Sequence, residues 1–336
     1  MLDLDGSDGG GQLVRSALTC SLLTGEGFDL SGIRGDRPNP GLRPQHLAAV
    51  ELATDIGDAT VTGDAIESGH LTFEPGAVSP GGYAVDVGTA GSLTLLCDVV
   101  VPLAAHLDSQ LDLTLDGGTD VKWSPPTDFH RHVKLPLLRS AGWDVTLAVE
   151  RRGFYPAGGG RIELSLSPCD PSPLQLTDRG ASEHAHVFAV ESEHLADAEV
   201  ADRLATAAEE GLASEWSVES STETVASDSP GAVVVVRLDY EGGVAGVSAL
   251  GEKGVPAEDV AEQAVDAVRA FDVGTGAVDA HLADQLVLPV ALAGGTVRIP
   301  EVTDHVATNV DLLQAFGFDV TLDEREADAV LSAPVP

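Results

Sequence analysis

His305 is the residue of this sequence best suited to nucleophilic chemistry. Residues 305–316 form an amphipathic run, and Asn309 follows His305 after one helical turn. Both polar side chains therefore share a face, which is not the face of the apolar residues Val306, Val310, Leu313 and Phe316. A neutral imidazole nitrogen can attack phosphorus, because the ring titrates near neutral pH. The alternative is an ordinary surface histidine near a helix start, and the other motifs of the chain favour the nucleophile.

A second candidate for phosphate chemistry is a loop that carries Arg34, Arg37 and Arg43. Its proline and glycine residues keep it out of helix and sheet until a helix that is predicted to begin near Gln45. Guanidinium groups bind phosphate oxygens through paired hydrogen bonds. The same arginines can pair with the abundant carboxylates of the chain, so the loop alone does not decide between a phosphate site and surface ion pairs.

Two glycine-rich turns precede predicted helices. Asp8 stands before the three glycines 9–11, where its carboxylate could meet a magnesium ion carried by phosphates or remain an exposed turn residue. Residues 86–92 follow a predicted strand, and their backbone N–H groups could cradle a phosphate. They match neither of the common glycine-rich nucleotide motifs, so a tight strand-to-helix turn is the simpler interpretation.

The other histidines include a polar helix tip and two closely spaced pairs. His281 and Gln285 open a helix whose later residues are apolar, which suits a ligand site, although Asp284 could simply cap the helix. The pairs at 130/132 and 184/186 could each present two metal ligands on one face of a strand. No third ligand has recognisable spacing, so these histidines do not favour a metal site.

The composition is that of a folded protein with a large core. The 336 residues are 43% hydrophobic, and there is no run of 18 apolar residues that could span a membrane. The N-terminus is acidic and enters a strand pattern, so no signal peptide is expected. Cys20, Cys97 and Cys169 are odd in number and far apart, which favours buried thiols in a reducing compartment. We therefore expect a cytoplasmic protein without a membrane-bound segment.

The net charge is −36, from 54 acidic and 18 basic residues. Such a charge usually argues against a nucleic-acid partner, which requires a basic surface. It is also typical of proteins that work at molar salt, where the Debye length falls to about 3 Å. Because the acidic residues are spread over an apolar, patterned sequence, we favour a halophilic protein over a disordered one.

Three segments share one ending and indicate an internal repeat. Each is a helix tail, a glycine expected in the left-handed C-cap conformation, and then a strand; the glycines are Gly57, Gly142 and Gly317. A glycine-rich turn and another apolar helix precede each ending. We therefore predict an α+β fold of three units, each with several strands and two helices on one face of the sheet.

The spacing of these glycines predicts an inserted domain. Gly57 and Gly142 are 85 residues apart, whereas Gly142 and Gly317 are 175 apart, so the third unit has an excess of 90 residues. Residues 180–260 contain 17 acidic residues against three cations, and their pattern predicts strand, helix, strand, strand and helix. We place a small inserted domain at residues 178–273. A large three-repeat domain then consists of residues 1–177 and 274–336.

Together the motifs resemble those of the RNA 3′-terminal phosphate cyclase family over nearly the whole chain. Residues 152–160 and the pairing of 281–285 with the late histidine carry most of the resemblance. The other matching segments, in order, are residues 9–16, 34–47, 86–92, 117–120 and 124–129. The resemblance implies three repeats of a four-stranded sheet with two helices, plus a small inserted α/β domain, in agreement with the repeat spacing.

The resemblance also implies a reaction in three steps. A histidine attacks the α-phosphorus of ATP, which gives a covalent His–AMP and releases pyrophosphate. The AMP then passes to an RNA 3′-phosphate, and the neighbouring 2′-OH closes a 2′,3′-cyclic phosphate and releases AMP. Magnesium, or manganese, and arginines would absorb charge on the phosphates.

Carried over by position, the resemblance assigns roles to individual residues. His305 would be the nucleophile, and Asp8 would bind the metal ion. The ATP site would be lined by His281, Leu282, Ala283, Asp284, Gln285 and Asp98. RNA 3′-phosphate ends and the other phosphates would be held by Arg15, Arg34, Arg37, Arg43 and Gln45.

Two positions depart from the family pattern. Many members have glutamate where this chain has Asp8, which implies a shorter reach to a metal ion here. Many have glutamine where this chain has Asp98, and a carboxylate near a nucleotide must turn away from the phosphates.

Two other protein classes have a similar fold and give alternatives to cyclase activity. Non-catalytic relatives that act in ribosome assembly have a similar fold but lack the histidine, whereas His305 is present here. Enolpyruvyl transferases have a similar repeat architecture but a lysine-rich substrate site, and this chain contains only three lysines. The sequence leaves open the physiological RNA and the oligomeric state, a homodimer included.

Overall fold

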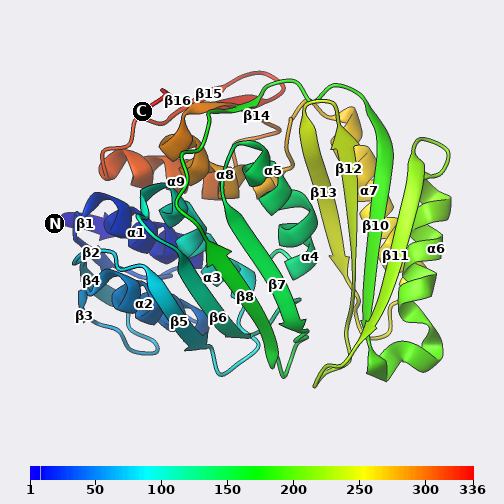
Figure 1. Ribbon diagram of the computed structural model, residues 1–336, viewed down its shortest axis with the longest axis horizontal. Helices are drawn as coiled ribbons and strands as arrows, with labels where there is room; N and C mark the ends of the chain where they lie inside the picture. Colours follow the sequence, from blue (N-terminus) through cyan, green and yellow to red (C-terminus); the bar gives the residue numbers. More distant parts are fainter. Residues whose placement is uncertain (8) are drawn as a thin grey trace.

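One order of elements occurs three times along the chain: strand, helix, strand, helix, strand, strand (Figure 1). The computed structural model describes residues 1–7 and 9–336. In each repeat the first two strands are parallel, and the fourth strand lies antiparallel between the second and the third. The predicted α+β fold built from four-stranded sheets and helices is therefore confirmed.

The first repeat has the sheet order β1-β2-β4-β3. Its elements are β1 (Leu2–Asp5), α1 (Gly11–Thr24), β2 (Phe28–Ser31), α2 (Pro44–Gly57), β3 (Thr60–Thr62) and β4 (His70–Glu74). Helices α1 and α2 bury their apolar faces against this sheet.

The second repeat has the sheet order β5-β6-β8-β7. Its elements are β5 (Gly81–Asp86), α3 (Leu93–Val100), η1 (Val101–His106), β6 (Leu111–Gly117), α4 (Thr127–Phe129), η2 (His130–Lys134), α5 (Leu135–Ser140), β7 (Val145–Arg151) and β8 (Gly160–Leu166). The segments α4, η2 and α5 are continuous, and η2 is a π-helical turn between two α-helical pieces. Such turns are often found near functional sites.

The third repeat is interrupted after its first strand. Its sheet has the order β15-β16-β14-β9 and consists of β9 (Leu174–Leu176), β14 (Gly295–Ile299), β15 (Thr321–Glu324) and β16 (Ala329–Ala333). Its helices are α8 (Ala280–Ala293) and α9 (Asp304–Ala315).

Between β9 and α8 the chain forms a further sheet, ordered β11-β10-β12-β13. Its elements are β10 (Ser182–Ser192), η3 (Glu193–Ala198), α6 (Val200–Leu212), β11 (Ser217–Val225), β12 (Ala232–Tyr240), β13 (Gly243–Leu250) and α7 (Ala257–Val273). Figure 1 shows α6 and α7 on one face of this sheet. Strand β11 was not among the elements predicted from the sequence.

The sheet between β9 and α8 has a hydrophobic core of its own. One face of β10 and β12, including Val187 and Val234, packs with α6 and α7. The other face, including Val233 and Val235, joins the large core that runs through all three repeats. Arg179 joins the segment that enters this sheet to the segment that leaves it. Its guanidinium donates to the carbonyl oxygens of Phe271, Gly274 and Gly276 at 3.0, 2.8 and 2.8 Å. These features support our proposal of an inserted domain at residues 178–273.

The predicted repeat endings are right at two of the three positions. Gly142 and Gly317 have positive φ angles of 91° and 88°. At the first ending the left-handed residue is Asp58, with φ 43°, and not Gly57. Gly57 stays inside α2 for a packing reason, since a Cβ there would lie 2.3 Å from Cδ2 of Leu22.

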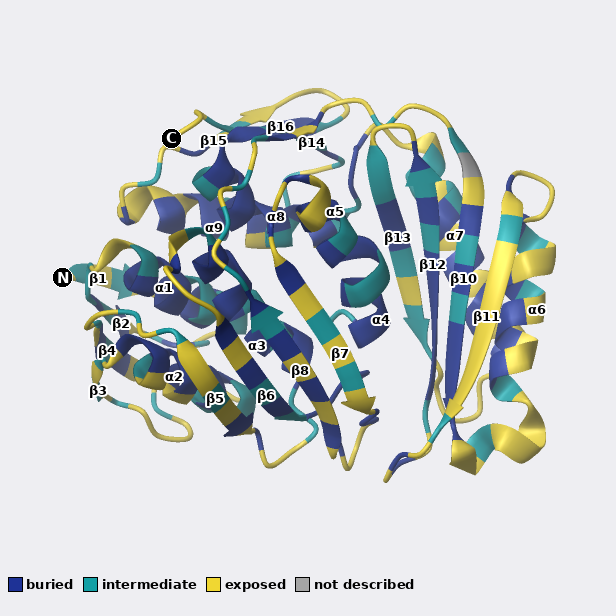
Figure 2. Ribbon diagram, viewed as in Figure 1, coloured by how far each residue is buried: buried dark blue, intermediate teal, exposed yellow. Residues whose placement is uncertain are grey.

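Burial follows the layers of the fold (Figure 2). The inner faces of the helices are buried against the sheets, whereas most of β11 is exposed. Cys20 and Cys97 are buried free thiols, and Cys169 is half-buried. Among the described residues no helix is both long enough and apolar enough to cross a membrane.

Candidate active site

His305 lies in the first turn of α9 and contacts a carboxylate on the neighbouring helix. Thr303 caps α9, because its hydroxyl oxygen accepts from the Val306 N–H at 3.2 Å. Oδ2 of Asp284, on α8, lies 3.2 Å from Nδ1 of His305. A carboxylate only accepts, so Nδ1 carries the proton and Nε2 presents its lone pair. The half-exposed imidazole is thereby held in one orientation.

Asn309 connects three helices beneath His305. Its Oδ1 accepts from the Ser16 hydroxyl on α1 at 2.8 Å, and its Nδ2 donates to the carbonyl oxygen of Asp284 at 3.2 Å. Asn309 is only 5% exposed, so this amide is a positioning group. His305 and Asn309 do share a polar helix face, as predicted, and that face is directed at α1 and α8.

His305 stands between two hollows of very different size. The larger has a volume of about 1100 Å³ and is lined by residues of α1, α3, α8, β13, α7 and the loop 122–126. The smaller has a volume of about 70 Å³. Three residues line both hollows, namely Gln12, His305 and Asn309. A group bound in one hollow can therefore reach the same imidazole as a group bound in the other.

Arg37 and the start of α1 line the small hollow. A Cβ added to Gly10 would lie 3.6 Å from Nη2 of Arg37 and 4.0 Å from Nε2 of His305. Because Gly10 has no side chain, this space stays open between the guanidinium and the imidazole. Gly10 is also the N-cap of α1 and has no side chain to cap it, so the first N–H groups of this helix suit an anion.

Arg15 lines the large hollow, close to two carboxylates. Burial lowers the pKa of its guanidinium, and the charges of Asp98 and Asp284 oppose that shift. Within residues 1–7 and 9–336 the guanidinium makes no hydrogen bond or ion pair. It is therefore a cation in the cavity wall that can receive a phosphate.

Asp98 faces a buried cation. Its Oδ1 lies 2.5 Å from Nζ of Lys134 and 2.9 Å from Nε2 of His130. Burial alone would raise the pKa of the Asp98 carboxyl, but Lys134 and His130 hold it well below its usual range. The negative charge that Asp98 brings to the cavity is thus compensated by Lys134.

Comparison with known proteins agrees with these observations. Residues 7–322 match the model of the family described as RNA 3′-terminal phosphate cyclase. A protein of that name from Halobacterium salinarum is 48% identical over 98% of both chains. A protein of the same name from Methanosarcina mazei is 36% identical over 100% of both chains. Another from Thermococcus kodakarensis is 39% identical over 94% of this chain and 92% of its own. The chain belongs to the RNA 3′-terminal phosphate cyclase family.

Not every residue assigned from the family resemblance lies at the two hollows. His281, Asp284, Gln285 and Asp98 line the large one. Leu282 and Ala283 are fully buried in the core. Asp8, the expected metal ligand, lies outside the described residues.

Of the three loop arginines, only Arg37 lines one of the two hollows. Arg37 faces the small hollow, whereas Arg34 holds its own loop through the carbonyl oxygens of Asn39 and Gly41 at 2.8 and 3.0 Å. Arg43 precedes α2, 3.5 Å from Glu67. The Gln45 side chain accepts from the Ser92 N–H at 3.4 Å and so ties α2 to α3. These contacts give Arg34 and Gln45 structural roles in the described part of the chain.

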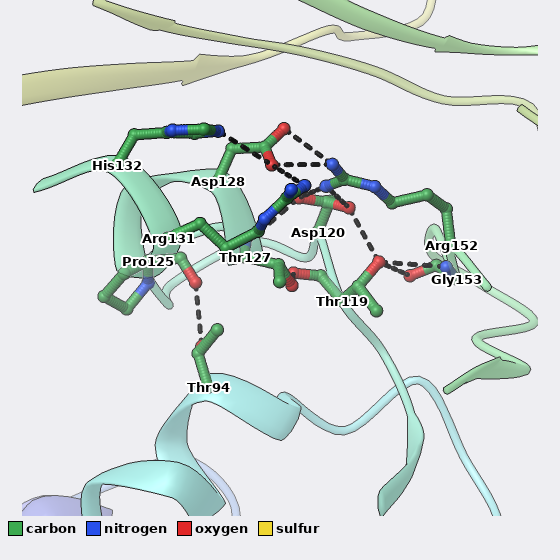
Figure 3. A network of polar contacts seen from close by, with 10 residues as sticks. All are labelled: Thr94, Thr119, Asp120, Pro125, Thr127, Asp128, Arg131, His132, Arg152 and Gly153. Atoms are coloured by element: carbon green, nitrogen blue, oxygen red, sulfur yellow. Dashed lines mark hydrogen bonds and ion pairs between the residues drawn. The ribbon is translucent and has the colours of Figure 1, made fainter. Parts of the chain in front are cut away.

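Residues of the family motifs at 117–120, 124–129 and 152–160 form a buried network (Figure 3). Arg152 donates to both oxygens of Asp128 at 2.7 Å, and to Oδ2 of Asp120 at 3.2 Å. His132 continues the network towards the inserted sheet, where its ring stacks on Phe188 with centroids 3.8 Å apart. These motifs therefore position the helical segment that carries His130 and Lys134. His130 and His132 lie on a helix and not on a strand.

Sequence reasoning missed three residues of the cavities. Gln12 separates the two hollows, Lys134 compensates Asp98, and Trp123 lines the large hollow with its indole exposed. Gln12 and Trp123 lie within or beside family motifs, but neither residue type alone indicates a site. The contact of Lys134 with Asp98 joins residues 36 positions apart, which no local pattern predicts.

Proposed function

We propose that this protein converts an RNA 3′-terminal phosphate into a 2′,3′-cyclic phosphate with consumption of ATP. The observation that carries the proposal is the position of His305, held by Asp284 and shared by a nucleotide-sized hollow and an arginine-lined one. The names of the relatives supply the reaction class. They are the same for the haloarchaeal relative and for the more distant ones.

In the first step Nε2 of His305 attacks the α-phosphorus of an ATP molecule bound in the large hollow. The N–P bond forms as the bond to the bridging oxygen of pyrophosphate breaks. Asp284 stabilises the positive imidazole that develops, while Nδ1 keeps its proton. Arg15 lies in the same wall and offsets the negative charge on the phosphates.

In the second step the 3′-phosphate of RNA enters the small hollow. One of its oxygens attacks the phosphorus of the AMP, and the bond to Nε2 breaks, so His305 is regenerated. Arg37 and the N–H groups at the start of α1 would hold this phosphate. The 2′-OH then attacks the RNA phosphorus, AMP leaves, and the hydroxyl proton is lost to solvent or a base.

The described residues offer no complete magnesium site of their own. They contain no group of three or more His, Cys, Asp or Glu placed to hold a metal ion. Asp279 lines the large hollow, and its buried Oδ2 has no partner in the described part of the chain, so this carboxyl could add one ligand after a small rotation. One protein ligand fits a metal ion that arrives bound to the phosphates of ATP and neutralises part of their charge.

The test is to incubate the purified protein with ATP and two RNAs that differ only in a 3′-phosphate or a 3′-OH end. Only the 3′-phosphate RNA should become resistant to phosphatase and gain a 2′,3′-cyclic end, with one AMP formed per end. Equal formation of AMP with both RNAs would contradict cyclase activity. Binding of RNA with no ATP consumption would support the non-catalytic assembly factor instead.

A further inference from the structure

Trp123 is the most exposed large apolar side chain in the described part of the protein. Its indole is 96% exposed, whereas Trp143 and Trp216 are 2% and 7% exposed. Trp123 also lines the large hollow that reaches His305. A large aromatic ring left in water at the edge of a cavity has no role in the core, so its position points to a ligand.

The backbone at Trp123 is itself unusual. Its φ is +63°, in the left-handed region that a bulky side chain rarely adopts. Such conformations persist where the surrounding structure fixes them, and they are concentrated at binding and active sites. Here the turn directs the indole into the solvent beside the cavity instead of into the core.

The loop 122–126 is anchored at both ends. Nζ of Lys122 lies 2.8 Å from Oε1 of Glu252, which follows β13, and the carbonyl oxygen of Pro125 accepts from the Thr94 hydroxyl at 2.8 Å. The Ser124 hydroxyl donates to the carbonyl oxygen of Val121 at 3.0 Å. The indole is thus carried by a held turn between the second repeat and the inserted sheet.

The surroundings of Trp123 suit a nucleobase better than a protein partner. Its chain neighbours Lys122 and Ser124 are polar, so the indole does not belong to a run of exposed apolar residues of the kind found at protein interfaces. Aromatic side chains stack on any base, because every base has a π face. Lys122 is held by Glu252 at 2.8 Å, so it fixes the loop beside the ring and leaves the indole face free for a base.

We propose that Trp123 is a stacking platform for a nucleobase that enters the large hollow. The base belongs either to ATP or to the RNA end, and both are stacked by the same chemistry. The proposal depends on the proposed function only for the identity of these two ligands. Stacking itself requires no reaction at His305.

The test compares Trp123→Leu, which removes the ring, with Trp123→Phe, which retains a smaller one. Because Trp143 and Trp216 are buried, the solvent-exposed tryptophan fluorescence comes from Trp123. Wild-type protein is titrated separately with a non-hydrolysable ATP analogue and with an RNA that ends in a 3′-phosphate. At least one of them should quench this emission, and Trp123→Phe should bind that ligand with the quench greatly reduced.

The affinity of the two variants gives the second readout. Trp123→Leu should bind the quenching ligand about tenfold more weakly, the effect expected for one lost base stack, and Trp123→Phe should recover most of the affinity. A change with the ATP analogue assigns the platform to ATP, and a change with the RNA assigns it to the RNA end. Unchanged affinity of Trp123→Leu for both ligands would overturn the proposal, as would an altered oligomeric state with ligand binding intact.

Failure of this proposal can be told apart from failure of the proposed function. The same titrations are repeated on His305→Ala, in which no covalent step can occur at this residue. Quenching that persists there supports the platform whatever the reaction is. Cyclase activity with unchanged binding by Trp123→Leu would overturn the platform and leave the proposed function intact.

Discussion

Oδ2 of Asp284 accepts a hydrogen bond from Nδ1 of His305 at 3.2 Å, across two helices and 21 positions of sequence. The contact fixes the tautomer of the ring and directs Nε2 towards both hollows. Asp284 was expected to line the ATP site, and it does line the large hollow. Its contact with the imidazole also holds the ring of His305 in one orientation.

Replacement of Asp284 by Asn should slow formation of the His–AMP intermediate by about a hundredfold or more. The amide can stabilise the wrong tautomer and cannot offset the positive charge of the attacking imidazole. The measurement is the single-turnover rate of labelling by ATP with a radioactive α-phosphate. Asp311→Asn makes the same charge change on an exposed position of α9 and is the control. Equal rates in the two variants would remove Asp284 from the mechanism.

Replacement of Arg37 by Ala should impair transfer of AMP to RNA and leave labelling of the protein by ATP largely intact. Arg37 lines the small hollow, and the two half-reactions use different phosphates. The loss should be on the order of tenfold to a hundredfold, as for a lost charged hydrogen bond to a phosphate. The control is Arg325→Ala, a surface arginine near Asp323. An equal loss in both half-reactions would place Arg37 at the ATP instead.

The repeat architecture could be predicted because it leaves a local signal. A helix tail followed by a glycine and a strand recurs at Gly142 and Gly317, and both adopt the expected left-handed conformation. Gly57 differs because close packing on Leu22, and not the backbone angle, requires glycine there. Strand β11 was missed because its serine, threonine and glutamate residues are exposed and carry no apolar alternation.

The site could be predicted in part. His305 and Asn309 are one turn apart, so their shared face follows from the sequence alone. Which arginine faces the imidazole does not, because Arg34 and Arg37 lie only three positions apart in the same irregular loop. The structure separates them through backbone carbonyls that bind Arg34. Long-range pairs such as Lys134 with Asp98 have no local pattern and require the fold.

Stability should fall as the pH drops from about 6.5 towards 4, because the folded state keeps the buried His46 and the partly buried His132 neutral. Burial and nearby arginines lower the pKa of His46 to about 3. Burial is also the main cause that lowers the pKa of His132, to about 4. Between these values and the unfolded value of 6.5 the unfolded chain binds more protons, so acid favours unfolding. Each histidine contributes up to about 1.4 kcal/mol per pH unit.

Urea denaturation at several pH values between 4 and 7.5 checks this expectation. The free energy of unfolding should be highest above pH 6.5, and His46→Gln should have a shallower dependence on pH. A free energy of unfolding that stays constant over this range would mean that these histidines are not held neutral by the fold.

Stability should rise with KCl towards molar concentrations. The 54 acidic residues repel one another, and salt screens this repulsion once the Debye length is about 3 Å. RNA binding should oppose this trend, since phosphate contacts weaken with salt through counterion release. Thermal unfolding in 0.1 M to 3 M KCl measures the first effect, and a midpoint that is highest at low salt would contradict a halophilic protein.

Covalent chemistry at His305 can be tested in one labelling experiment. The protein is incubated with ATP labelled at the α-phosphate, digested, and the labelled peptide is sequenced by mass spectrometry. We expect one acid-labile AMP on His305 and none on His305→Ala. Because His305 is half-exposed, this substitution should leave the fold intact. Full labelling of His305→Ala, or an AMP found on His281 instead, would contradict covalent chemistry at His305.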